Sequence, residues 1–385
     1  MHFILILLIV MAFFVIEKIL HDRRLRRIPI RIHVNGTRGK SSTVRLIAAA
    51  LREAGIRTLA KTTGNEPILI FPDGHEERVF RRGAPRIQEQ MRFIKKAAEI
   101  AAEAVVVECM ALDPHLQSIS ETKMIKSTLG VITNVRQDHL EVMGRSLGDI
   151  AYSLSQMIPR DGILITADRR YFDYFKSQAM KKNTEVCLAE ETSEMAQGRK
   201  MGLVLRENWP VVKQVCSRLG ISVSIPLNEL ERHISDLEPS RIMTVHYKER
   251  TIFFIDAFSA NDIDSTMIIQ DRTLDETTCP RPYVALVNNR SDRPLRMLSF
   301  SSFLSCQPIY DYIFLTGSLR WLAERAFLKK DNSANVMILK NREPEKMLAE
   351  LCQRIASSEF TLVGMGNYKK IGAALSHFLS QRGKS

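Results

Sequence analysis

The sequence predicts an α/β fold in which a P-loop-type, mostly parallel sheet is followed by a smaller C-terminal α/β domain and preceded by one transmembrane helix. Three observations support this prediction. Residues 30–46 change from the alternation of a strand to the spacing of a helix across a glycine-bearing turn. Short β-branched runs then alternate with helical patterns along the chain, as parallel sheets require. Residues 3–16 carry no charge.

The apolar run at the start of the chain predicts a membrane anchor over residues 1–20. It is short for a bilayer, but Ile19 and Leu20 extend it, and Lys18 can reach the interface with its ammonium group. Residues 21–29 are expected to form a basic juxtamembrane linker, which by the positive-inside rule predicts a cell-membrane protein with its catalytic domains in the cytoplasm. A buried or interfacial helix is the alternative.

Length and composition narrow the class of protein. A chain of 385 residues is long enough for two domains, and its six cysteines contain no C-x-x-C pair, which favours reduced thiols over a zinc site. The formal charge of +12 suits a nucleic acid, an anionic membrane or a polyanionic substrate. No basic strand studded with aromatic residues is present, so we do not expect nucleic-acid binding.

The order of strands and helices predicts a central α/β domain over residues 30–280 and a C-terminal α/β domain over 281–385, with the linker near 271–282. Helices are expected at 41–54, 86–102 and 147–157. Strands are expected at 30–35, 104–109, 129–134, 162–167, 184–188 and 251–256 in the first domain, and at 283–288, 311–316, 335–339 and 360–363 in the second.

The strand-to-helix turn near residue 36 predicts a phosphate-binding loop. Gly36 and Gly39 let the backbone approach phosphate oxygens, Lys40 can reach a terminal phosphate, and the Ser41 hydroxyl is placed to hold Mg²⁺. The match to G-x-x-x-x-G-K-[ST] is incomplete, because Val34 occupies the first glycine position. The expected nucleotide-binding segment consists of Gly36, Thr37, Arg38, Gly39, Lys40, Ser41 and Ser42.

Polar residues at the ends of predicted strands are the other candidates, because active groups of open α/β sheets collect at the carboxyl ends of strands. Glu108 ends the apolar run AVVVE, and Asp256 ends TIFFID. Asn134, Asp138 and His139 lie in TNVRQDHLEVMG, where a strand leaves its sheet. We expect Glu108 to face the same crevice as the phosphate loop.

Taken together, these motifs resemble the Mur ligase superfamily, which includes folylpolyglutamate synthase. The resemblance implies a central domain that binds ATP and Mg²⁺, with Ser41, Glu108 and His139 as metal ligands. The lysine that positions a second metal in many relatives falls on Leu154, which leaves the number of metals open.

The resemblance also implies roles for residues outside these motifs. Arg241 would contact the γ-phosphate, Asn208 and Asp256 would lie near adenosine, and Asn65 would add a phosphate contact. By its position, Asp138 is a candidate for the base that takes a proton from an incoming amine. The implied catalytic residues are Lys40, Asp138, His139 and Arg241.

A closer resemblance, over the whole chain, is to the ligase subunits of membrane-bound poly-γ-glutamate synthases. It rests on the basic-flanked anchor and on the segments NGTRGKS, VVECMALDP, TNVRQDHLEVMG, FSANDIDST, NNRSDR and VGMGN. It implies ATP-dependent polymerisation of glutamate through γ-carboxyl linkages and an acyl phosphate. Glutamate, the growing chain, the membrane and other membrane subunits are the implied partners, and a homo-oligomer is compatible with the sequence.

Two groups of arginines are candidates for holding glutamate carboxylates, although a solvated basic face is the alternative. They are Arg78, Arg81, Arg82 and Arg86 in the first domain, and Arg290 and Arg293 in the second. A folylpolyglutamate-type ligase and a membrane-tethered ATPase that powers assembly or export are the competing hypotheses. The sequence leaves open whether L- or D-glutamate is used and whether ADP or AMP is the product. It also leaves the polymer length open.

Overall fold

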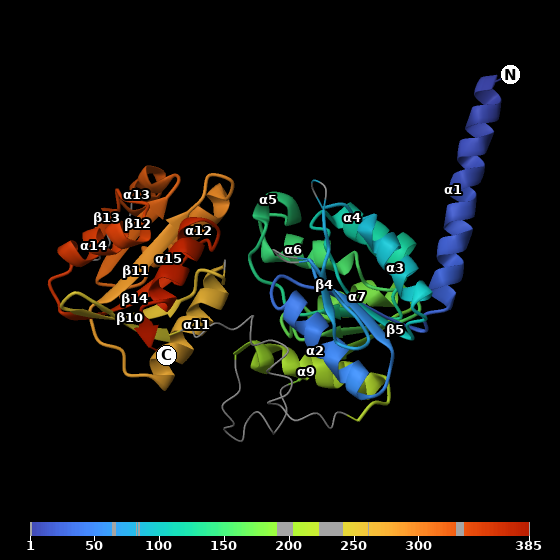
Figure 1. The fold of residues 1–385 in the computed structure, drawn as a ribbon, viewed down its shortest axis with the longest axis horizontal. Helices are drawn as coiled ribbons and strands as arrows, with labels where there is room; N and C mark the ends of the chain where they lie inside the picture. The colour runs from blue at the N-terminus through green and yellow to red at the C-terminus, as the bar shows by residue number, and fades with distance from the viewer. Residues whose placement is uncertain are drawn as a thin grey trace. The chain divides into compact units, whose positions relative to one another are not determined.

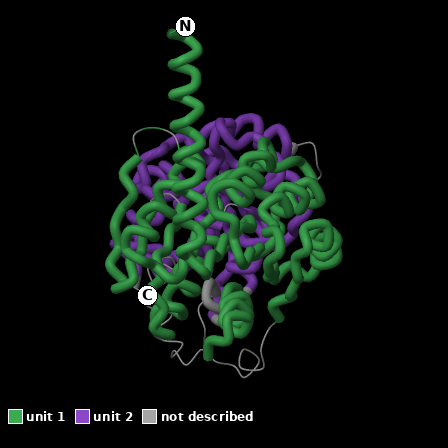
Figure 2. Tube along the Cα trace, turned by 90° about the vertical axis from the view of Figure 1, so that its right-hand side faces the viewer, with its two compact units in different colours: residues 1–238 green, residues 239–385 purple. Residues whose placement is uncertain are grey.

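In the computed structural model the chain forms two compact units, residues 1–238 and 239–385 (Figures 1 and 2). Each has its own sheet and its own apolar core. The structure describes residues 2–63, 67–81, 83, 85–190, 203–222, 242–260, 262–328 and 335–384.

The first unit is built on a mostly parallel sheet. Within the described residues this sheet has eight strands in the order β4-β3-β2-β5-β1-β6-β7-β8. All neighbouring strands from β2 to β8 are parallel, while β3 and β4 form an antiparallel extension. The strands are β1 (Ile30–Asn35), β2 (Thr58–Lys61), β3 (Ile68–Ile70), β4 (Glu76–Arg78), β5 (Ala104–Glu108), β6 (Leu129–Ile132), β7 (Ile163–Thr166) and β8 (Glu185–Leu188).

Helices cover both faces of this sheet, so each central strand is buried on both sides, as parallel strands usually are. On one face, α2 and α9 pack over alternate strand residues such as Ile32 and Val34. On the other face, α3 and η1 form one core and α6 and α7 another. The helices are α2 (Lys40–Glu53), α3 (Glu89–Glu99), α4 (Pro114–Ile119), the π-helix η1 (Ser120–Ile125), α5 (Leu140–Met143), α6 (Leu147–Ser155), α7 (Phe172–Met180) and α9 (Leu203–Arg218).

Helix α1 (His2–Arg26) leaves the first unit as one long rod (Figure 1). In the part of the chain that the structure describes, it is the one helix long and apolar enough to cross a membrane, and none of the residues in its most apolar window is buried. Its last turns, in contrast, pack onto the domain. Leu25 lies in the core beside α3, and His21 Nε2 is 2.8 Å from the Met124 carbonyl oxygen. The predicted linker over residues 21–29 is therefore wrong for 21–26, which continue the helix.

The second unit contains a sheet of seven strands among its described residues, in the order β13-β12-β11-β14-β10-β9-β15. Strands β13 to β10 are parallel, and β9 and β15 are antiparallel at one edge. The elements are β9 (Ile242–Tyr247), β10 (Arg250–Asp256), α11 (Ile263–Glu276), β11 (Tyr283–Asn289), α12 (Pro294–Leu304), β12 (Tyr312–Gly317), α13 (Arg320–Leu328), β13 (Asn335–Ile338), α14 (Pro344–Arg354), β14 (Glu359–Met365), α15 (Ile371–Ser380) and β15 (Gly383–Lys384).

The α/β class with two sheets agrees with the sequence prediction, but the boundary at residue 280 does not. Strand β10, which we expected in the first domain, pairs with β14 and β9 of the second sheet. The second unit therefore begins at residue 239. Helix α11 occupies the first half of the segment that composition indicated as a linker.

Candidate active site

The phosphate loop forms the tight turn between β1 and α2, and two positions in it require glycine. Gly36 has φ of 130°, and a Cβ atom there would lie 2.0 Å from Thr133 Oγ1. Gly39 has φ of 77°, and its Cβ would lie 2.5 Å from Asn208 Oδ1. No side chain caps the start of α2 at Gly39. Amide groups at such a helix start, together with the helix dipole, favour an anion.

The segment that follows β6 holds this loop in place. The Thr37 hydroxyl donates to Asn134 Oδ1 at 2.7 Å, and the Arg38 amide donates to the same oxygen at 3.0 Å. The Thr133 hydroxyl donates to the Arg38 carbonyl oxygen at 2.6 Å, and the Arg136 amide donates to the Thr37 hydroxyl oxygen at 2.8 Å. The sequence predicted that the loop and Asn134 lie together, and the structure shows that Asn134 organises the loop backbone.

Ser41 and Glu108 meet beside the loop, as predicted. The Ser41 hydroxyl donates to Glu108 Oε2 at 2.7 Å, and the Thr63 amide donates to that oxygen at 2.8 Å. Glu108 is buried at the end of β5, next to β1 in the sheet. A hydroxyl and a carboxylate at a phosphate loop suit a hard divalent cation, which usually takes one or two carboxylates and completes its shell with phosphate oxygens and water.

The described residues contain no group of three or more His, Cys, Asp and Glu side chains that could hold a metal ion by themselves. The donor set at Ser41 and Glu108 therefore fits a cation that arrives with a nucleotide. His139, the third predicted ligand, lies at the start of α5 with φ of 47°, and its Nε2 is 3.8 Å from Asp138 Oδ2. Its part in metal binding stays a prediction.

The two basic side chains of the loop, Lys40 and Arg38, contact loop carbonyl oxygens and the Asp138 carboxylate. Lys40 Nζ donates to the carbonyl oxygens of Gly36, at 2.6 Å, and Thr37, at 3.3 Å. Its ammonium group therefore lies over the loop where a phosphate would bind. Arg38 Nη2 lies 3.3 Å from Asp138 Oδ2, which is mostly buried. The predicted base is thus paired with a loop arginine.

Asn208 also lies beside the loop, because a Cβ atom at Gly39 would approach its side chain. It lies within α9, where its Oδ1 accepts a hydrogen bond from the Thr43 hydroxyl at 2.9 Å. The neighbouring Glu207 pairs with Arg136 at 3.2 Å. Helix α9 is therefore bound to both the start of α2 and the segment after β6. Proximity of Asn208 to adenosine stays a prediction.

A buried polar layer lies behind the loop, on the face of β1 opposite to α2, and no sequence pattern indicated it. His33 Nδ1 lies 2.8 Å from Glu121 Oε2 on the π-helix, and neither side chain is appreciably exposed. Burial opposes protonation of His33, but hydrogen bonds with Cys109 and Glu121 outweigh it and raise the pKa of His33 to about 9. The strand that leads into the loop thus carries a buried charge.

The remaining predicted residues lie outside the described residues or in other parts of the chain. Asn65, Arg82 and Arg241 lie outside the described residues. Asp256 ends β10 and therefore belongs to the second unit, which corrects its predicted place in the first. Arg290, in the second unit, pairs with Asp292 at 2.5 Å, and Arg293 precedes α12.

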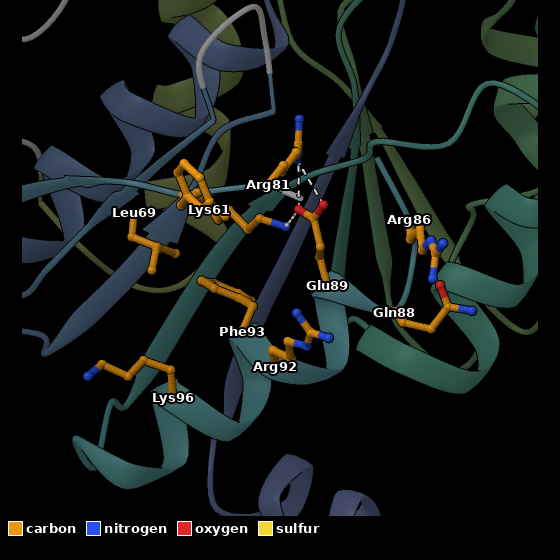
Figure 3. A pocket seen from close by; sticks show the side chains of 11 residues that line it. Lys61, Leu69, Arg81, Arg86, Gln88, Glu89, Arg92, Phe93 and Lys96 are labelled. Carbon is orange, nitrogen blue, oxygen red and sulfur yellow. Dashed lines mark hydrogen bonds and ion pairs between the residues drawn. The ribbon is translucent and has the colours of Figure 1, made fainter. Parts of the chain in front are cut away.

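The first-unit arginines divide into two groups. Arg78 lies on the exposed strand β4, whereas Arg81 and Arg86 line a cavity of about 920 Å³ (Figure 3). We call this cavity the basic pocket. Its charged side chains are Lys61, Arg81, Arg86, Glu89, Arg92 and Lys96. Sequence reasoning missed Lys61, Glu89, Arg92 and Lys96, although the last three recur at helical spacing on α3.

Comparison with known proteins gives the family. Residues 34–209 match the Mur ligase middle domain, and residues 242–382 match the poly-gamma-glutamate synthase CapB C-terminal domain. The capsule biosynthesis protein CapB of Bacillus anthracis is 36% identical over 289 residues, which are 74% of this chain and 62% of that protein. PGA synthase CapB of Bacillus subtilis (strain 168) is 31% identical over 299 residues, with 76% of each chain covered. The chain belongs to the CapB family.

Family membership confirms the resemblance that the motifs indicated. The solved structures agree on the fold: a bifunctional folylpolyglutamate synthase/dihydrofolate synthase with Mn, AMPPNP and L-glutamate bound matches with a TM-score of 0.59 at 12% identity. That match covers 93% of this chain and 91% of the other. The CapB family model begins at residue 242, close to the start of the second unit, and so agrees with the corrected boundary.

Proposed function

We propose that this chain is an ATP-dependent amide ligase that polymerises glutamate through its γ-carboxyl group. The observation that supports this most directly is the phosphate loop with Ser41 and Glu108 joined beside it, in a member of the CapB family. The curated relatives are named for capsule or PGA synthesis, and the solved neighbour binds Mn, AMPPNP and L-glutamate. The same combination of nucleotide, divalent cation and glutamate suits this site.

The residues of the site suggest how bond formation would proceed. A carboxylate needs a leaving group before an amine can displace oxygen, and transfer of the ATP γ-phosphate gives an acyl phosphate. The loop amides and Lys40 would offset the charge that spreads over the transferring phosphoryl group. Ser41 and Glu108 would hold Mg²⁺, which neutralises phosphate charge when bound. The amine of the incoming glutamate then attacks the acyl carbon, and phosphate leaves.

Asp138 remains our candidate for the base that takes the amine proton. Its carboxylate is mostly buried and paired with Arg38, so it lies at the loop and not in bulk solvent. Arg241 would complete the γ-phosphate site, and Asp256 would contribute near adenosine. These two roles rest on the family resemblance.

We further propose that α1 anchors the chain in the cell membrane, with both units on the cytoplasmic side. Its length and apolar composition suit a span, and the basic residues in its last turns suit the cytoplasmic interface. Other membrane subunits of a synthase complex would be partners.

The test is phosphate release by membranes that carry the full chain, with and without L- or D-glutamate. We expect glutamate to stimulate release, and Lys40→Ala to lower it by about 10²–10³-fold because a charge at the transferring phosphate is lost. Arg45→Ala is the matched control, since it also removes a cation from α2. The guanidinium of Arg45 contacts Glu76. Release that needs no glutamate would instead indicate an ATPase and refute the ligase.

A further inference from the structure

The basic pocket combines an apolar floor with a cationic rim. Leu69, Val79 and Phe93 line it together with the charged groups (Figure 3). Among the described lining residues, five side chains are basic and Glu89 is the one acid. Arg92 and Lys96 project from α3 at its edge and are exposed, whereas Lys61 is buried. A cavity of this size falls within the range of about 300–1,000 Å³ that is typical of ligand sites.

The pocket already holds one carboxylate of the protein itself, the side chain of Glu89. Arg81 donates to the Glu89 carboxylate, from Nε to Oε1 at 2.8 Å and from Nη2 to Oε2 at 3.1 Å. Lys61 Nζ lies 3.1 Å from Glu89 Oε2. Hydrogen bonds from Arg81 and Lys61, acting against burial, lower the pKa of Glu89. Burial lowers the pKa of the Lys61 ammonium even with Glu89 beside it. Because five basic side chains line the pocket against this one carboxylate, the pocket can accept further negative charge.

Two short connections join the pocket to the active site. Lys61 ends β2, and two residues later the Thr63 amide donates to the Glu108 carboxylate. On α3, Glu89 lies in the pocket while the adjacent Gln90 donates through Nε2 to the Glu108 carbonyl oxygen at 3.3 Å. Both walls of the pocket thus hold Glu108, the carboxylate that meets Ser41. The pocket is therefore joined through neighbouring residues of β2 and α3 to the carboxylate that meets Ser41.

We propose that the basic pocket binds the end of the growing γ-linked polyglutamate chain, whose activated carboxyl group accepts the next glutamate, an inference that rests on the proposed function. A γ-linked chain carries one free carboxylate on each unit along a backbone of methylene and amide groups. Arg86, Arg92 and Lys96 at the rim suit the carboxylates, and the apolar floor suits the methylenes. The volume accommodates a short stretch of polymer.

The experiment measures binding directly, without turnover. A fluorescein-labelled γ-linked glutamate oligomer is titrated with the full chain in detergent, without ATP, and followed by fluorescence anisotropy. The double variant R92E/K96E reverses two rim charges, and K95E is its control, because Lys95 lies on the same helix, is also exposed and does not line the pocket. Thermal unfolding checks that both variants fold.

We expect R92E/K96E to weaken binding of the γ-linked oligomer by about tenfold, and K95E to stay within about twofold of wild type. An α-linked oligomer of equal length should bind less tightly, because its free carboxylates lie at the ends of side chains, whereas those of the γ-linked oligomer are attached directly to the backbone. Equal affinity of wild type and R92E/K96E, or of the two oligomers, would overturn the assignment.

Turnover then separates this inference from the proposed function. In glutamate-stimulated phosphate release, R92E/K96E should raise the KM for the oligomer acceptor and leave the KM for ATP unchanged. An unchanged acceptor KM would refute the pocket alone. Charge-dependent oligomer binding without glutamate-stimulated turnover would support the pocket and refute the ligase.

Discussion

The buried pair of His33 and Glu121 makes the stability of the first unit depend on pH in a defined direction. The pKa of His33 is raised to about 9 in the folded chain, against 6.5 for the ordinary side chain. The stabilisation is therefore fully present below pH 6.5, declines as pH rises, and is lost above about 9. The difference in pKa corresponds to about 3 kcal/mol of unfolding free energy.

Glu121→Gln should remove the part of this contribution that comes from Glu121, while the hydrogen bond with Cys109 remains. The substitution keeps a side chain that can accept from the Ser127 amide and hydroxyl, which now donate to Glu121 Oε1 at 2.8 and 2.9 Å, but it removes the charge beside His33. We expect a loss of up to about 3 kcal/mol at pH 6 and little change above pH 9, because His33 is then neutral in both proteins.

Tryptophan fluorescence can follow this unit alone. The sequence contains two tryptophans, buried Trp209 on α9 of the first unit and exposed Trp321 in the second. In a Trp321→Phe background, denaturant unfolding at several pH values therefore reports the free energy of the first unit. If Glu121→Gln shows the same decline between pH 6.5 and 9 as its parent, the ion pair is not the cause and the reasoning fails.

Three further predictions concern the loop and the anchor. Gly39→Ala should weaken binding of an ATP analogue by at least about tenfold in a calorimetric titration, since both the positive φ of Gly39 and the nearby Asn208 side chain exclude a Cβ atom. Gly55→Ala is the control and should leave this affinity unchanged, because Gly55 also has positive φ but no atom lies within 4 Å of its Cβ position. Asn134→Ala should lower the same affinity by about 1–3 kcal/mol, because Thr37 and Arg38 lose their shared acceptor, and unchanged binding would contradict this. Leu25→Ala should destabilise the first unit by about 2–5 kcal/mol in the fluorescence assay, while exposed Leu20→Ala in detergent should have little effect.

The parts of the fold that could be predicted were those with strong local patterns. Strand β1 matches its predicted range because β-branched residues alternate there and a glycine turn follows. Glu108 could be placed beside Ser41 because the carboxyl ends of parallel strands share one edge of the sheet. Strands such as β3, with three residues, depend on pairing with their neighbours and have no pattern of their own.

The domain boundary could not be predicted because the relevant contact is distant in sequence. Strand β10 resembles the strands before it, and its place in the second sheet is decided by pairing in which Thr251 lies beside Glu359. The buried charge of His33 was equally hidden. An alternating strand with a polar residue indicates one solvated face, and only the π-helix that covers this face shows that His33 is enclosed.

Helix α1 continues without a break from its apolar part to the residues that pack on the first unit, so its orientation and that of the domain are coupled. Transmembrane helices tilt by about 20° on average and change their tilt with bilayer thickness. In the membrane-anchored chain that we propose, a flexible linker would absorb such a rotation, whereas the buried contacts of His21 and Leu25 would transmit it to the domain. Because α3 both packs against the end of α1 and lines the basic pocket, lipid composition would set the angle at which that pocket faces the bilayer surface.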